Sequence, residues 1–135
     1  MANKNETEPT IPKPLLWGPS CKKDLLNLPD PVQDKIGYAL YLAQCGMKHP
    51  DAKPLKGFKG AGVLEVVEND DGNTYRAVYT VKFPGAVFVL HVFQKKSKSG
   101  ISTPTVDIEK IQTRIKAAEK RYGEWIAQQE RSQED

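Results

Sequence analysis

Two charged residues in apolar, alternating segments have side chains suited to phosphate or proton-transfer chemistry. Arg76 lies on the expected polar side of the alternating run 74–83. An arginine grips a phosphate through its planar guanidinium. The other interpretation is a surface ion-pair partner, whose removal would change stability by only ~0–1 kcal/mol.

Glu65 lies inside the apolar run 63–68. If its face is covered, the pKa of its carboxyl should rise toward that of a general base; otherwise it is an exposed edge glutamate.

His91 is a third candidate, in the apolar run 86–93. Strand alternation gives it Val89 and Phe93 as expected neighbours on one face. It is therefore either a buried, hydrogen-bonded core histidine or a group that transfers a proton.

Two groups of lysines could supply positive charge for a polyanion. The first follows the apolar run 86–93 and consists of Lys95, Lys96 and Lys98. The second lies in the Lys/Gly/Pro-rich connection 48–62 and consists of Lys53, Lys56 and Lys59. Lysines at these positions fit contacts to a phosphate backbone, and they fit solvated loops equally well.

Motifs for other chemistries are missing from the sequence. It has no P-loop, dinucleotide-binding fingerprint, HExxH motif or GxSxG nucleophile elbow. His49 and His91 lack metal-like spacing to carboxylates, and Cys21 and Cys45 form no CxxC pair. We therefore expect no metal site and no cofactor.

The elements that must position these residues indicate an α+β domain. A helix is expected over 31–45, because Asp30-Pro31 is typical of a helix start and Gly46 of an end. A strand at 14–18 and a short helix at 20–28 precede it. Three strands are expected at 63–68, 74–83 and 86–93, with a hairpin turn at 69–73.

A last helix of about 20 residues, beginning near Thr103-Pro104, carries one apolar stripe. We expect all helices to cover one side of an antiparallel sheet. Strand 74–83 is expected to pack against Ile108, Ile111 and Ile115 of this helix through Tyr75, Tyr79, Val81 and Phe83.

Length and charge favour one domain with a polyanionic partner. The 135 residues suit a single domain at 14–128, between a flexible lead (1–13) and a flexible tail (129–135). The net charge is +3, and the segment 48–98 holds nine Lys or Arg against five Asp or Glu. There is no apolar stretch of membrane-spanning length and no signal-peptide core, so we expect a cytoplasmic protein without a membrane partner.

Three motifs together resemble the RelE/HigB superfamily of bacterial toxins, in particular its phage-derived HigB-like branch. They are KPLKG (53–57), YRAVY (75–79) and VLHVFQKKSKSG (89–100), and the likeness extends from about residue 15 to 122. The resemblance implies a small twisted antiparallel sheet with two N-terminal helices and a long C-terminal helix.

The resemblance also implies a function. Members are toxins of type II toxin–antitoxin systems that cleave mRNA on the ribosome without metal, by attack of the ribose 2′-OH on the adjacent phosphate. A helix-turn-helix antitoxin holds them inactive. The alternative is a catalytically weak or inactive toxin-fold module that binds an antitoxin, the ribosome or RNA.

Position by position, Arg76 matches the family's arginine on the scissile phosphate. The lysines at 95, 96 and 98 match its basic segment, and Glu65 falls where some relatives have lysine. Many relatives carry a catalytic tyrosine or histidine where this chain has Ile101, Ser102 and Thr103.

Overall fold

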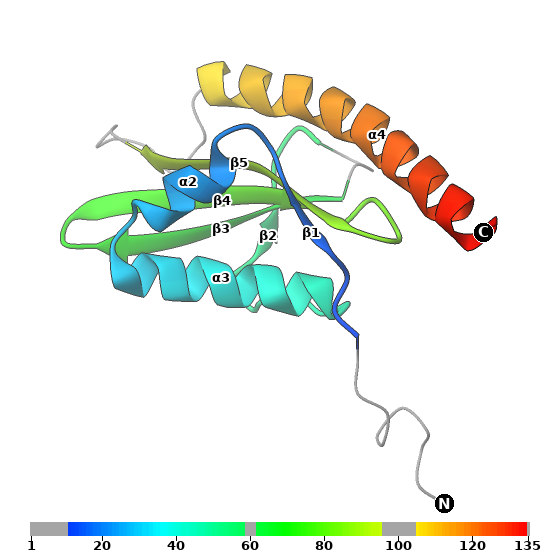
Figure 1. Ribbon diagram of the computed structural model, residues 1–135. Helices are drawn as coiled ribbons and strands as arrows, with labels where there is room; N and C mark the ends of the chain where they lie inside the picture. The colour runs from blue at the N-terminus through cyan, green and yellow to red at the C-terminus, as the bar shows by residue number, and fades with distance from the viewer. Residues whose placement is uncertain (1–10, 59–61, 96–104, 135) are drawn as a thin grey trace, which may run out of the picture.

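A five-stranded sheet between two helical layers forms the protein (Figure 1). The computed structural model describes residues 11–58, 62–95 and 105–134. Its elements are, in chain order, β1 (Leu15–Trp17), α2 (Cys21–Leu26), α3 (Asp30–Gln44), β2 (Lys53–Pro54), β3 (Val63–Asp70), β4 (Asn73–Thr80), β5 (Val87–Lys95) and α4 (Thr105–Glu134). The α+β class and the order of the expected elements agree with expectation, and β2 is an additional strand.

The strand order in the sheet is β1-β5-β4-β3-β2. The expected meander of β3, β4 and β5 is antiparallel. Each edge carries a short strand: β1 runs parallel to β5, with Leu15 opposite Val87, and β2 runs antiparallel to β3, with Lys53 opposite Glu65. The sheet is thus mixed, and the two-residue β2 had no signal in the sequence.

Helices cover both faces of the sheet, so the expectation of helices on one side is wrong. In Figure 1, α3 lies against one face and α4 crosses the other. Tyr75 and Tyr79 pack with Ile36 and Leu40 of α3, instead of against α4 as expected.

The residues that pack against α4 come mostly from the other side of β4 and from β5. Ile111 and Ile115 share a cluster with Val78 and Leu90, and Phe83 joins it as expected. Because β4 is a central strand with both faces covered, its supposed polar side is buried as well. The last residue of the expected set, Val81, is 38% exposed.

A β-bulge in β5 changes which residues share a face with His91. Val78 is paired with His91 while the next residue, Tyr79, is paired with Val89, so Leu90 is an extra residue. Leu90 and His91 both reach the α4 side, whereas Val89 packs on the α3 side. Val89 is therefore not a face neighbour of His91, although Phe93 is.

The helix ends also differ from expectation. Pro29, rather than Asp30, precedes the first turn of α3, and no side chain caps that turn. The Gln33 side-chain amide donates to the carbonyl oxygens of Leu26 and Leu28 and thereby ties α3 to the segment before it. The last helix has 30 residues and continues to Glu134, through most of the segment expected to be a tail. No helix within the described ranges is long and apolar enough to span a membrane.

Candidate phosphate-binding groove

Arg76 and Glu65 form an ion pair on the α4 side of the sheet. The Arg76 Nη1 lies 2.8 Å from Glu65 Oε2. The two residues come together because β3 and β4 pair with Val67 opposite Arg76, which places Glu65 diagonally across from it on the same face. The Arg76 side chain is only 4% exposed and that of Glu65 18%. The expectation of an arginine on an exposed polar face is therefore wrong, and a small effect of Arg76 on stability is no longer expected.

These two residues line an open groove of about 480 Å³ near the β2 edge of the sheet. The lining residues are Asp51, Lys53, Glu65, Val67, Asn69 and Arg76. Three of the predicted site residues thus share one surface. Its two cations are matched by two carboxylates, so the described residues of the groove carry no net positive charge.

The remaining lysines are only partly placed. Lys53, on β2, is exposed and lies opposite Glu65 of β3. Lys56 is exposed in the turn that follows β2 and does not line the groove. Lys95 ends β5 with its Cα paired to Thr74, two residues before Arg76 along β4. The predicted residues Lys59, Lys96 and Lys98 and the segment Ile101–Thr103 lie outside the described residues.

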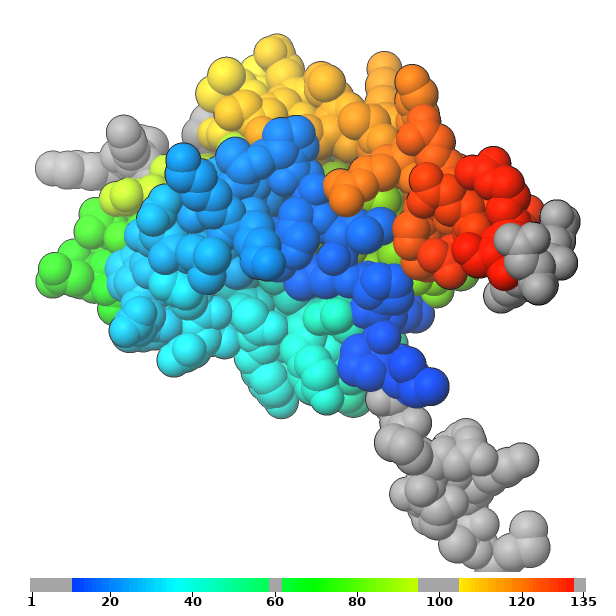
Figure 2. Space-filling view, viewed as in Figure 1, coloured from blue at the N-terminus to red at the C-terminus, as the bar shows by residue number. Residues whose placement is uncertain are grey.

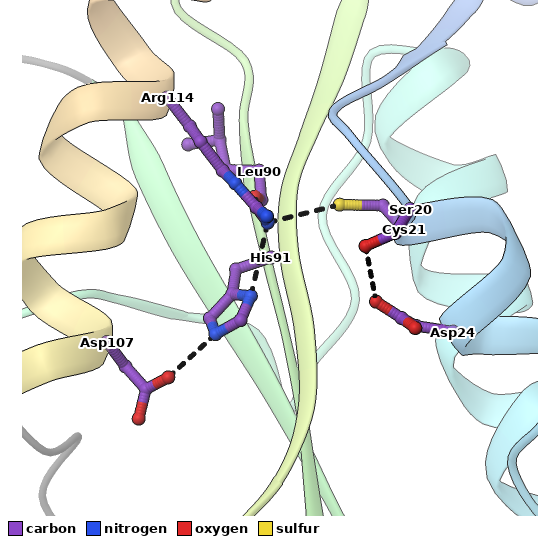
Figure 3. A network of polar contacts seen from close by, with 7 residues as sticks. All are labelled: Ser20, Cys21, Asp24, Leu90, His91, Asp107 and Arg114. Atoms are coloured by element: carbon purple, nitrogen blue, oxygen red, sulfur yellow. Dashed lines mark hydrogen bonds and ion pairs between the residues drawn. The ribbon is translucent and has the colours of Figure 1, made fainter.

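His91 lies between β5 and α4, where both ring nitrogens have partners (Figure 3). Its Nε2 is 2.7 Å from Asp107 Oδ1, and Arg114 Nη1 lies 3.2 Å from its Nδ1. Since arginine only donates, Nδ1 accepts and Nε2–H donates to the carboxylate. The ring also stacks on Phe93, with 4.3 Å between the centroids. His91 is thus a buried, hydrogen-bonded residue that joins α4 to β5.

Burial lowers the pKa of His91 below its ordinary value of 6.5. The Asp107 carboxylate opposes this shift, whereas Arg114 and Lys110 reinforce it. If Nδ1 were protonated, its N–H would face the N–H of Arg114, and two hydrogen-bond donors would oppose each other. The neutral ring is therefore the form that fits this position, and His91 is separate from the residues that line the groove.

Arg114 and Asp107 are the polar residues at this interface that sequence reasoning missed. The Arg114 Nη1 donates to Leu90 O at 2.8 Å and also faces the Cys21 sulfur at 3.7 Å (Figure 3). Burial raises the pKa of the Cys21 thiol, and Arg114 partly opposes this. The sequence did contain a signal for Arg114, since it directly precedes Ile115 of the apolar stripe. The aliphatic part of an arginine side chain often packs along the border of such a stripe.

Asp51 and Asn69 are the polar groove residues that the sequence did not single out. The sequence places Asn69 in the expected hairpin turn at 69–73, where a polar residue has an obvious structural role, but in the structure it lies in β3, opposite Thr74. Asp51 forms a 2.8 Å ion pair with Lys35, which lowers the pKa of its carboxyl. Within the described part of the chain, no group of three or more His, Cys, Asp or Glu could hold a metal ion.

Comparison with known proteins gives a family and two solved structures of similar fold. Residues 23–116, well over half of the chain, match the family model described as phage derived protein Gp49-like. A mutant of the E. coli toxin RelE in the free state is 20% identical, with a TM-score of 0.45, over 61% of this chain and 82% of that one.

The RelBE2 toxin–antitoxin complex of Mycobacterium tuberculosis gives 19% identity and a TM-score of 0.40, over 67% of this chain and 99% of the matched chain. At these identities the likeness concerns the fold alone. No sequence match was found among proteins of curated function. The family match agrees with the phage-derived resemblance carried by the motifs at 53–57 and 75–79, and this chain belongs to the phage-derived Gp49-like family.

Proposed function

We propose that this protein is the toxin of a type II toxin–antitoxin system and cleaves mRNA on the ribosome without metal. The observation that carries the proposal is the groove that brings Arg76, Glu65 and Lys53 together on an open face of the sheet. Membership of a phage-derived family and the likeness in fold to RelE toxins support it. The cytoplasm, which holds mRNA and ribosomes, is the compartment that this function requires.

The proposed reaction is attack of a ribose 2′-OH on the adjacent phosphate. The new bond joins the 2′ oxygen to phosphorus, the bond to the 5′ oxygen breaks, and the products are a cyclic phosphate and a 5′-OH. The reaction needs a base for the 2′-OH, positive charge for the pentavalent phosphate and an acid for the leaving oxygen.

Arg76 is suited to the second requirement. Its guanidinium carries five N–H donors in a fixed plane, so a bond from Nη1 to Glu65 can orient the group while other donors face a phosphate. We assign Glu65 to positioning this guanidinium. The ribosome would supply much of the remaining rate by orienting the mRNA.

The first test is induction in a bacterium without its neighbouring gene. Growth and protein synthesis should stop, and co-expression of the partner, which we expect to be a helix-turn-helix antitoxin, should restore both. In a reconstituted translating-ribosome assay, mRNA should be cut, and an mRNA with 2′-deoxyribose at the cut position should remain intact. Unaltered growth at high levels of folded protein would contradict the toxin function.

Variants of Arg76 test the residue assignment. Arg76→Lys keeps a positive charge that can pair with Glu65 but loses the planar fork, so the protein should fold while cleavage falls sharply. Lys82→Ala is the control, because it removes a cation from an exposed ion pair of equal length, 2.8 Å to Glu119. If the Arg76→Lys protein cleaves mRNA as fast as the Lys82→Ala protein, Arg76 is not part of the catalytic site.

One observation favours the second candidate, a module that binds without cleaving. Arg76 is almost fully buried, and the carboxylates of the groove match its cations in number. The two candidates differ in one measurement. A binding module would stop translation or bind its antitoxin while ribosome-bound mRNA remained intact.

A further inference from the structure

The loop after α3 runs back along the side of that helix toward the groove. The contacts that hold it there join later loop residues to earlier helix residues: Met47 N–H to Leu42 O at 2.7 Å, the His49 ring to the Tyr38 ring at 5.7 Å between centroids, and Asp51 to Lys35 at 2.8 Å. Asp51 and Lys53 then line the groove itself. The Tyr38–His49 ring pair therefore lies beside the groove, around the β2 edge of the sheet.

The two rings are arranged so that aromatic surface remains available. Tyr38 is 55% exposed, and the rings are nearly perpendicular, at 82°. In an edge-to-face pair one ring uses an edge and the other a single face, so this contact by itself covers no more than one face of either ring. His49 is half-buried, and Tyr38 provides most of the exposed aromatic surface. The Asp51 backbone N–H donates to His49 Nδ1 at 3.0 Å and orients the imidazole.

The charges around the ring pair favour a polyanionic ligand with flat groups. Residues 47–58 contain Lys48, Lys53 and Lys56 against a single acid, Asp51, and Lys35 pairs with that acid. Exposed aromatic rings interleaved with cations are typical of surfaces that bind single-stranded nucleic acid. Helix α3, cyan in Figure 2, lies on the molecular surface with nothing packed over its outer side in that view.

We propose that Tyr38 and His49 form a base-stacking platform for single-stranded RNA beside the groove. This inference rests on RNA being the substrate, as the proposed function holds. Arg76 on β4 and Lys53 on β2 are separated by β3, and two strand spacings amount to about 10 Å. An RNA backbone that runs from Arg76 across β3 therefore reaches the loop between α3 and β2. A base next to the bound phosphates would then stack on an open ring face.

The test measures binding of a short single-stranded RNA with 2′-O-methyl groups, which has no 2′-OH and cannot be cleaved. Fluorescence anisotropy should show that Tyr38→Ala weakens binding about tenfold, the typical effect of losing one base stack. Tyr38→Phe keeps the ring and should bind within about twofold of wild type. Leu26→Ala is the control, because Leu26 is 60% exposed on a different helix, α2, and its RNA affinity should match wild type.

Equal RNA affinity of Tyr38→Ala and wild type would overturn the platform, even if wild type cleaves mRNA as proposed. A Tyr38→Ala protein that keeps RNA affinity but loses an antitoxin would overturn it in favour of a protein-binding surface. A wild-type protein that neither binds RNA nor stops translation would overturn the platform together with the proposed function.

Discussion

Replacing Arg76 by alanine should destabilise the protein substantially. The substitution leaves the Glu65 carboxylate, 18% exposed, without the guanidinium that lies 2.8 Å away. Removing one partner of a buried pair typically destabilises by about 3–5 kcal/mol. Because Glu65 keeps some contact with water, we expect the lower end, about 3 kcal/mol. For a chain of this length that corresponds to a fall of about 10 °C in Tm.

Urea denaturation of wild type and variant, followed by circular dichroism, measures this change. A double-mutant cycle with Arg76→Leu, Glu65→Leu and the double variant isolates the pair. The double variant should be more stable than the sum of the single effects predicts, because each single variant keeps a charge that has lost the partner 2.8 Å away, whereas the double variant keeps neither charge. Lys82→Ala, from an exposed pair, should change stability by less than about 1 kcal/mol. A loss below about 0.5 kcal/mol for Arg76→Ala would refute the reasoning, since that is the effect of an ordinary surface substitution.

Three further predictions follow from the packing of the core. Ile111→Ala, at a side chain with no exposure, should destabilise by about 2–5 kcal/mol, whereas Val106→Ala on the same helix, 67% exposed, should have almost no effect on urea unfolding. Burial lowers the pKa of His91 from its ordinary value of 6.5, so as the pH falls, His91 of the unfolded chain is protonated before His91 of the folded protein. The free energy of unfolding should therefore be at its full value above about pH 6.5 and decrease below it. In His91→Gln, the decrease in stability below about pH 6.5 that is due to His91 should disappear. Identical pH profiles of stability for wild type and His91→Gln would contradict this prediction. The Tyr79 hydroxyl is buried with no hydrogen-bond partner among the described residues, and burial raises its pKa to about 12. Tyr79→Phe should therefore match or exceed wild-type Tm, and a clear loss would show that the hydroxyl has a partner.

The antiparallel meander and the two main helices could be predicted because each rests on local periodicity. The run at 74–83 alternates, the hairpin turn is rich in Asn, Asp and Gly, and the stripe of α4 recurs at three- and four-residue intervals. Such signals lie within a single element. They do not reveal which face of β4 meets which helix, because Tyr79 and Val78 are both suited to burial.

The faces of β5 and the edges of the sheet could not be predicted, because they depend on contacts between distant segments. The extra residue Leu90 reverses the alternation at His91, and an apolar run on both faces gives no sign of where a bulge falls. The groove shows the same limit: Arg76 and Glu65 could each be named from the sequence, but their pairing depends on the register between β3 and β4.

The parallel pairing of β1 with β5 has a consequence for the order of folding. Leu15 pairs with Val87, so a strand near the start of the chain must wait until more than half of the chain has been synthesised. The meander and α3 depend on nearer contacts and can form earlier, since short loops close at a lower entropic cost. Docking of β1 should therefore be a late event. Until it occurs, the outer edge of β5 has free backbone N–H and C=O groups and can pair with another chain, so a truncation that removes β1 should promote aggregation.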